Sequence, residues 1–157
     1  MITIDILKNH PQTLPRLAKI WYEALGSVYC PDTTISQAEQ KFLTHLSDNE
    51  LPLTYIALEE NTPIGMCSLR KNDGIRPDVI PWLASLVVDP DYQRQGIGKR
   101  LIEAVKTKAK ELGFSTLHLF AFDVTISDYY ARLGWSIVNM DTCKEHPIVV
   151  MEMDLVE

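Results

Sequence analysis

The segment 88–99, Val-Asp-Pro-Asp-Tyr-Gln-Arg-Gln-Gly-Ile-Gly-Lys, has the residue types that a phosphate-binding loop needs. An apolar, β-rich run leads into it, and a helix-like run over 101–112 follows it. Backbone N–H groups at a helix N-terminus attract a phosphate, and Gly96 and Gly98 have no Cβ to keep it away. The spacing lacks the Gly-Lys-Ser/Thr of a P-loop and the third glycine of a dinucleotide-binding loop. The segment therefore predicts a phosphate or pyrophosphate site of another kind.

The pattern Gln93-x-x-Gly96-x-Gly98 resembles motif A of the GNAT superfamily of acyl-CoA-dependent N-acyltransferases. In that family the motif is Gln/Arg-x-x-Gly-x-Gly/Ala, and its backbone amides hold the pyrophosphate of coenzyme A. The preceding β-run ending in Val-Asp-Pro and the following amphipathic helix strengthen the resemblance. It implies that acetyl-CoA is the co-substrate and that it is bound by Gln93, Arg94, Gln95, Gly96, Ile97, Gly98 and Lys99. For the side chains of Arg94 and Lys99, a phosphate contact and a solvated surface charge are equally good readings.

The strand before this motif has its own role in the family, where pantetheine pairs with the strand's exposed backbone. By position, Leu86, Val87 and Val88 would supply these backbone groups here. One amide would also face the thioester carbonyl, and such an oxyanion donor contributes ~3–4 kcal/mol in acyl transfer. A simple buried strand is the other reading, and both can hold because the side chains can pack while the backbone binds.

Residues 128–135, Asp-Tyr-Tyr-Ala-Arg-Leu-Gly-Trp, resemble the family pattern Tyr-x-x-Leu-Gly-Phe, whose tyrosine lies next to the cofactor sulfur. The matching residue is Tyr130, which we expect to be the catalytic general acid. A phenol with an ordinary pKa near 10 can protonate the coenzyme A thiolate as it leaves. Tyr129 is the alternative acid, and an aromatic core residue is the alternative role for Tyr130.

The sequence departs from the family pattern at two places. Asp123 stands where many members carry an asparagine that holds pantetheine, and an ionised Asp accepts but does not donate a hydrogen bond. The strand over 82–86 carries no glutamate that would act as general base. The amine proton would then leave through water or through Glu23, Glu59 or His146, each of which is also an ordinary surface residue.

Composition limits the other classes of function. The 157 residues carry a formal charge of −6, with 46% hydrophobic and 23% charged residues, which is typical of a globular protein. The acidic balance argues against a nucleic-acid partner, and it suits either a cationic acceptor or simple solubility. No apolar run reaches the ~18 residues that a membrane span needs. The N-terminus has no signal-peptide pattern, so we expect a cytoplasmic protein, and a homodimer is compatible with the sequence.

Cysteines and histidines suggest no further chemistry. Cys30, Cys67 and Cys143 form no CxxC pair, and the four histidines share no metal-ligand spacing, so we expect no metal. A Gly-x-Ser-x-Gly nucleophile elbow is absent from the sequence, and direct acyl transfer needs no covalent intermediate.

Hydrophobic periodicity and turn residues predict the secondary structure. Gly26 is expected to end the first helix, a capping box over 36–39 to begin the second, and residues 71–81, with Gly74 and Pro77, to form a loop. The predicted strands cover 1–6, 53–58, 63–70, 82–88, 115–121, 135–140 and 148–155, and the predicted helices begin near 14, 36, 99 and 126. This β-α-α-β-β-β-α-β-α-β-β order fits the GNAT-like α/β fold, a mixed, mostly antiparallel sheet of about seven strands with four flanking helices.

We therefore interpret residues 1–157 as a single N-acetyltransferase domain that moves acetyl from acetyl-CoA directly to a primary amine of a small molecule. The loops 26–35, 71–81 and 141–147 would frame the acceptor. A peptide or protein α-amine acetyltransferase is one alternative, and it would leave the groove between the first and last of these loops open. A non-catalytic acyl-CoA-binding or sensor domain is the other alternative, and it would not need Tyr130.

Overall fold

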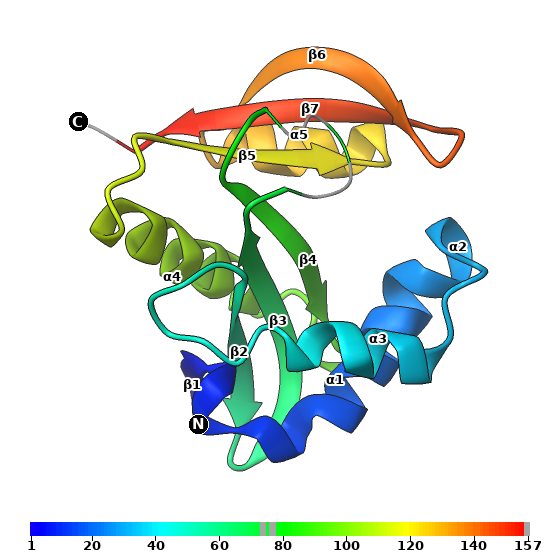
Figure 1. The fold of residues 1–157 in the computed structure, drawn as a ribbon, viewed down its shortest axis with the longest axis vertical. Helices are drawn as coiled ribbons and strands as arrows, with labels where there is room; N and C mark the ends of the chain where they lie inside the picture. Colours follow the sequence, from blue (N-terminus) through cyan, green and yellow to red (C-terminus); the bar gives the residue numbers. More distant parts are fainter. Residues whose placement is uncertain (73–74, 76–77, 156–157) are drawn as a thin grey trace.

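The computed structural model describes residues 1–72, 75 and 78–155, and it contains a seven-stranded sheet flanked by helices (Figure 1). Gly74 and Pro77 of the predicted loop lie outside the described residues. The sheet order is β1-β2-β3-β4-β5-β7-β6, and every neighbouring pair is antiparallel except β4 and β5. The strands are β1 (Ile2–Ile6), β2 (Leu53–Glu59), β3 (Thr62–Arg70), β4 (Trp82–Val88), β5 (Thr116–Ala121), β6 (Ser136–Cys143) and β7 (His146–Asp154).

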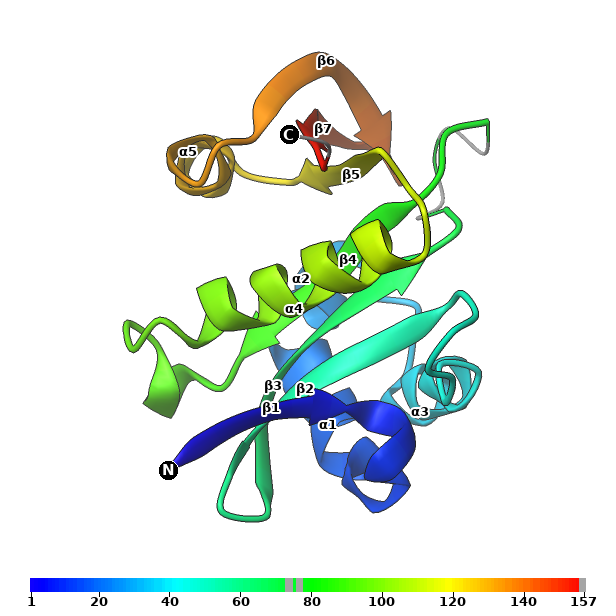
Figure 2. The same ribbon diagram turned by 90° about the vertical axis from the view of Figure 1, so that its left-hand side faces the viewer.

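Helices cover both faces of this sheet, in the order that the sequence predicts. Apolar residues of α1 and α3 pack with those of β2, β3 and β4 into one core, and those of α4 pack on the opposite face into a second core (Figure 2). No described helix is long and apolar enough to cross a membrane. The helices are α1 (Leu14–Trp21), α2 (Ser27–Tyr29), α3 (Ile35–Leu43), α4 (Ile97–Glu111) and α5 (Val124–Arg132). The predicted GNAT-like fold is confirmed.

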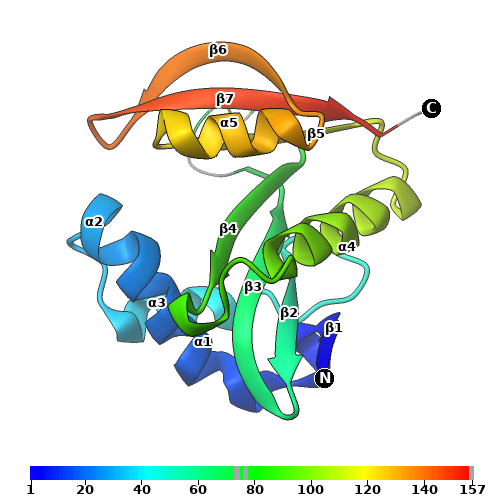
Figure 3. The same ribbon diagram turned by 180° about the vertical axis from the view of Figure 1, so that it is seen from behind.

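Strands β4 and β5 separate soon after they meet. Their parallel pairing is confined to Trp82 and His118, so the rest of β4 runs away from β5. Figure 3 shows β5, β6, β7 and α5 gathered on one side of this opening, with β1 to β4 and α4 on the other. The opening leaves an edge of β4 inside the molecule without a neighbouring strand, where an extended ligand can pair with its backbone.

A β-bulge lies in β4 at this opening. Ala84 pairs with Ser68 and Val87 with Met66, so two β4 residues stand opposite one residue of β3. Ser85, one of the two, has a φ of +56°, in the left-handed region that a residue with a Cβ rarely adopts. Such strained backbone is found most often at functional sites.

The first helices differ from the prediction in two places. Gly26 does not end the first helix, because a π-helical turn (Tyr22–Gly26) joins α1 to α2. A Cβ on Gly26 would lie 2.7 Å from the Trp21 ring, so the glycine lets that ring pack close. The capping box of α3 is formed by Thr34 and Gln37 and not by residues 36–39, since the Thr34 hydroxyl accepts from the Gln37 amide and the Gln37 side chain accepts from Thr34 N–H.

Candidate active site

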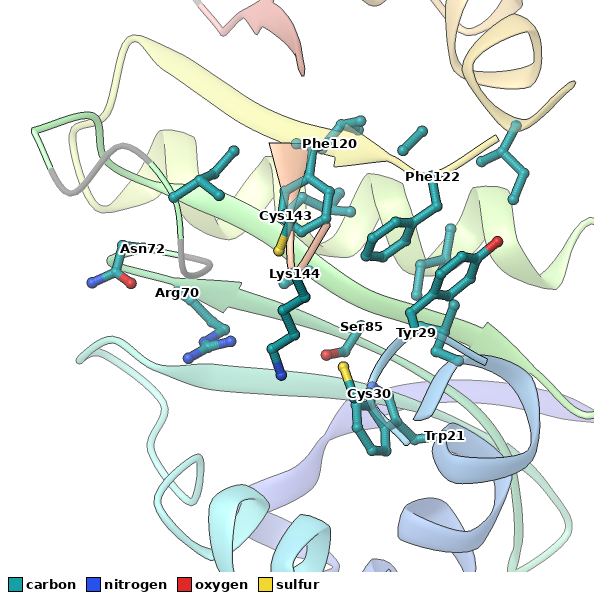
Figure 4. Close-up of a pocket in the computed structure, with 18 of the residues that line it drawn as sticks. Trp21, Tyr29, Cys30, Arg70, Asn72, Ser85, Phe120, Phe122, Cys143 and Lys144 are labelled. Atoms are coloured by element: carbon teal, nitrogen blue, oxygen red, sulfur yellow. The ribbon is translucent and has the colours of Figure 1, made fainter. Parts of the chain in front are cut away.

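A cavity of about 480 Å³ lies in the opening between β4 and β5 (Figure 4). Its floor comes from residues 83–86 of β4 and its opposite wall from residues 119–122, at the end of β5. Helices α1, α2, α3 and α5, the end of β3 with residues 72 and 75 after it, and the end of β6 with the turn that follows it also contribute to the described lining. Of the predicted cofactor-binding residues, Leu86 lines this cavity, and the bulge at Ser85 and Leu86 faces into it.

Aromatic residues join α2 to the other half of the sheet beside the cavity. The ring of Tyr29 stacks on the ring of Phe122, with centroids 3.9 Å apart and planes 7° from parallel. The His146 ring meets both of them edge-on, at centroid distances of 5.3 Å to Tyr29 and 5.9 Å to Phe122. These three residues, here called the aromatic bridge, therefore connect α2, which follows the π-helical turn after α1, to the start of β7 beside the β6–β7 turn.

Tyr130 lines the same cavity from α5 and is 6% exposed. Its ring packs edge-on against Trp135 and Tyr129. Burial raises the pKa of its hydroxyl above the ordinary value, and the neighbouring Cys67 and Tyr129 add to the effect. The hydroxyl therefore keeps its proton at neutral pH, which is the state that a general acid requires.

The glycine loop lies at the N-terminus of α4, at the far end of β4 from Trp82. Gly96 has a φ of +77° and precedes the first residue of the helix, and Arg94 also has a positive φ of 64°. A Cβ on Gly98 would lie 3.5 Å from the Tyr129 hydroxyl and 4.0 Å from a methyl of Val88. The loop, the end of β4 and helix α5 thus meet at Gly98. Tyr129, which is the alternative to Tyr130 as the acid, faces the loop.

The other predicted cofactor residues lie in this loop or on β4 before it, apart from Asp123, which precedes α5. Gln93 donates from its side-chain amide to the carbonyl of Val88 over 3.3 Å. The side chains of Arg94, Gln95 and Lys99 are exposed, whereas those of Ile97 and Val87 are buried in the two cores, so only their backbone groups remain for a ligand. Asp123 accepts from the Thr125 amide over 2.7 Å and begins α5, so its carboxylate already has a structural role.

None of the three candidate bases is among the described residues that line the cavity. Glu59 lies at the end of β2, 3.8 Å from the N-terminal amine, and exposed Glu23 lies 3.9 Å from Lys19. The His146 ring packs against Tyr29, which lines the cavity. In the described part of the chain, no three His, Cys, Asp or Glu side chains gather into a metal-binding group.

Sequence analysis did not identify the charged side chains at the cavity. Lys41 of α3, Arg70 of β3 and Lys144 of the β6–β7 turn all line it. The ammonium of Lys41 lies 5.5 Å from the centre of the Trp21 ring, which also lines the cavity. These residues come from three distant segments, and no local pattern in the sequence brings them together.

A buried polar chain lies behind this charged wall. His45 is 1% exposed, and its Nδ1 is 2.8 Å from the Thr54 hydroxyl, which is in turn 2.7 Å from the Ser68 hydroxyl. Burial, together with the positive charges of Arg70 and Lys41, lowers the pKa of His45 to about 3. His45 is therefore neutral at physiological pH.

Two relatives of known activity are similar in sequence. The chain is 23% identical to the peptidyl-lysine N-acetyltransferase YjaB of Salmonella typhimurium over 150 residues, which cover 93% of this chain and 95% of that protein. It is 31% identical to the chloroplastic GCN5-related N-acetyltransferase 2 of Arabidopsis thaliana over 77 residues, or 49% of this chain. That match spans only 28% of the length of the plant protein.

The fold is also similar to that of a solved structure, an aminoglycoside 6'-N-acetyltransferase complexed with coenzyme A. The TM-score is 0.75 over 100% of this chain and 98% of that chain, at 15% identity. The family model described as "Acetyltransferase (GNAT) family" matches residues 15–135, well over half of the chain, and this range includes the glycine loop and Tyr130. The protein therefore belongs to the GNAT family of acetyltransferases and is an acyltransferase.

Proposed function

We propose that the protein transfers the acetyl group of acetyl-CoA directly to a primary amine of a small molecule held in the cavity between β4 and β5. The amine nitrogen attacks the thioester carbonyl, a C–N bond forms and the C–S bond breaks. The amine loses one proton and the coenzyme A thiolate gains one, so the products are an N-acetyl amine and free coenzyme A.

The glycine loop and the open edge of β4 support one position for the cofactor. The pyrophosphate would accept hydrogen bonds from the backbone amides at the start of α4, where Gly96 and Gly98 allow close approach. The pantetheine would run along β4 toward the bulge at Ser85 and Leu86. That the similar aminoglycoside acetyltransferase was solved with coenzyme A supports this choice of cofactor.

The proton for the leaving thiolate would come from Tyr130. Tyr130 lines the cavity, and its hydroxyl is protonated at neutral pH, so it has a proton to give to the thiolate. Tyr129 is the less suitable donor, because the described cavity lining includes Tyr130 and not Tyr129.

The aromatic bridge is the observation that favours a small acceptor. A peptide acceptor would need an open groove between the loop after α1 and the β6–β7 turn. The stacked rings of Tyr29 and Phe122, with His146 against them, occupy this route. A compact amine can fill the cavity behind the bridge, whereas an extended chain would have to displace it.

An amine panel tests this proposal. Purified protein with acetyl-CoA is given small amines, polyamines, amino acids and lysine-containing peptides, and free thiol release is followed. We expect release with at least one small amine and little with the peptides. Coenzyme A binding without thiol release from any amine would instead support the non-catalytic alternative.

The relationship to YjaB favours one second candidate, acetylation of peptidyl lysine. The variants Tyr29→Ala and Tyr29→Phe separate the two functions, because only the first removes the ring that stacks on Phe122. For a small acceptor, Tyr29→Ala should raise KM while Tyr29→Phe should not. Wild-type turnover of peptides that exceeds turnover of every small amine would establish the peptidyl-lysine function instead.

A further inference from the structure

The charge of the cavity wall is opposite to that of the whole chain. The chain carries a net charge of −6, yet the charged residues among the described cavity lining are Lys41, Arg70 and Lys144, and no described lining residue is acidic. Lys41 and Arg70 are half-buried, and Lys144 extends from the β6–β7 turn along the cavity (Figure 4). All the charged side chains in the described lining of the cavity are therefore basic.

Arg70 lies far from the position proposed for the cofactor pyrophosphate. Arg70 pairs with Trp82 at one end of β4, whereas the glycine loop follows Val88 at the other end. Six residue steps along a strand correspond to about 20 Å. A pyrophosphate held at the glycine loop would therefore not reach Arg70.

We propose that the acceptor is a small amine that also carries a carboxylate, as an amino acid does. This inference rests on the proposed function and deepens it. The carboxylate would bind between Arg70 and Lys144, where a planar guanidinium can donate two parallel hydrogen bonds and an ammonium adds a point charge. The amine would reach the thioester beside Leu86, and the carbon skeleton would pack on Phe120 and Phe122.

The same wall disfavours polycationic acceptors. A polyamine or an aminoglycoside keeps additional ammonium groups after one amine has lost its proton. Placed in this cavity, these groups would lie against Lys41, Arg70 and Lys144 with no described carboxylate in the lining to neutralise them. Like charges in a partly desolvated site repel strongly, so such acceptors should bind weakly.

Matched acceptors test the inference. L-Phenylalanine is compared with phenethylamine and L-phenylalaninamide, and L-lysine with cadaverine and L-lysinamide, by thiol release at one pH. In each series both comparators lack the carboxylate. One comparator has a more basic amine than the acid, and the other has a less basic amine. A preference for the acid over both therefore cannot come from amine basicity. In at least one series we expect kcat/KM to be higher for the acid by about tenfold or more, the effect of one charge-assisted hydrogen bond.

Charge-changing variants then test whether Lys144 and Arg70 cause the preference for the acid. Lys144→Glu should lower the preference for the acid by about tenfold and improve turnover of cadaverine, because it changes the sign of one wall charge. Lys8→Glu makes the same charge change on the first helical turn after β1, at the opposite edge of the sheet, and should leave the preference unchanged. Arg70→Gln provides a second variant whose effect should resemble that of Lys144→Glu.

The outcomes separate this inference from the proposed function. Equal or faster turnover of the amines without a carboxylate would overturn the inference and leave the small-amine function standing. No thiol release from any member of either series or of the wider panel would overturn both. A preference for the acid that Lys144→Glu and Arg70→Gln leave intact would also overturn it, because the carboxylate would then bind elsewhere.

Discussion

Replacing each of the two glycines of the loop by alanine should change the stability of the protein in opposite directions. Gly98 is the second residue of α4 and has an ordinary helical φ, and an added Cβ would make only van der Waals contacts, at 3.5 Å and 4.0 Å. Because alanine is a better helix former than glycine by ~0.5–1 kcal/mol, Gly98→Ala should raise the melting temperature by about 1–4 °C. Gly96→Ala should lower it, since a non-glycine residue at a φ of +77° costs about 1–2 kcal/mol.

Gly98→Ala should weaken the binding of coenzyme A even though it stabilises the unliganded protein. A ligand at 100 times its Kd stabilises the native state by about 2.7 kcal/mol, and a tenfold weaker Kd reduces this to about 1.4 kcal/mol. If the pyrophosphate lies against the first turn of α4, the methyl of Gly98→Ala should cause such a loss while the unliganded protein becomes more stable. Thermal denaturation with and without coenzyme A measures both quantities in one experiment.

Gly113 provides the matched control for the strained position. It has a φ of +93° after the other end of α4, and nothing lies within 4 Å of an added Cβ, as at Gly96. Gly113→Ala should therefore lose as much stability as Gly96→Ala but keep the full coenzyme A shift. An unchanged coenzyme A shift in Gly98→Ala would refute the placement of the pyrophosphate, and destabilisation of unliganded Gly98→Ala would refute the account of the helix start.

Three further predictions concern the acid, the thiols and the buried histidine. Tyr130→Phe should lower turnover by ~10²–10⁴ with coenzyme A affinity little changed, whereas Tyr129→Phe should have a much smaller effect; similar rates for the two variants would remove Tyr130 as the acid. A variant with all three cysteines replaced by alanine should keep its turnover, and a trapped acetyl-cysteine in the wild-type protein would reverse this reading. His45 has a folded pKa of about 3 against 6.5 when unfolded, so the unfolded state binds more protons between these values and stability falls as pH drops. Urea denaturation should show that His45 lowers the free energy of unfolding by roughly 2.5 kcal/mol between pH 7 and 4.5, and His45→Gln should remove this part of the pH dependence.

The sequence predicted most of the fold because its signals are local. The range 82–88 is bounded by Pro81 and by Asp89-Pro90, and the strand has these bounds in the structure. The glycine at 26 misled the prediction because glycine usually follows a helix. Here the reason for Gly26 is the ring of Trp21, which occupies the place of a Cβ, and such a tertiary contact leaves no periodic trace in the sequence.

The site was predictable only in part, for the same physical reason. The glycine loop is a continuous segment, so its residue types reveal it. The aromatic bridge brings together Tyr29, Phe122 and His146, which are distant in the sequence, and their meeting depends on how α2 docks on the other half of the sheet. The loops expected to frame the acceptor do contribute lining residues, but which side chains enter the cavity required the structure.

The separation of β4 from β5 links the cofactor and acceptor sides of the site. If the two strands stayed paired beyond Trp82 and His118, β4 would have no open edge and the cavity would be filled. The bulge at Ser85 and Leu86 lies midway between the glycine loop and the positive wall, so a thioester held there is within reach of an acceptor from the opposite direction. In the proposed arrangement, the anionic cofactor and the anionic end of the acceptor would lie toward opposite ends of one strand, where they would not compete for the same cations.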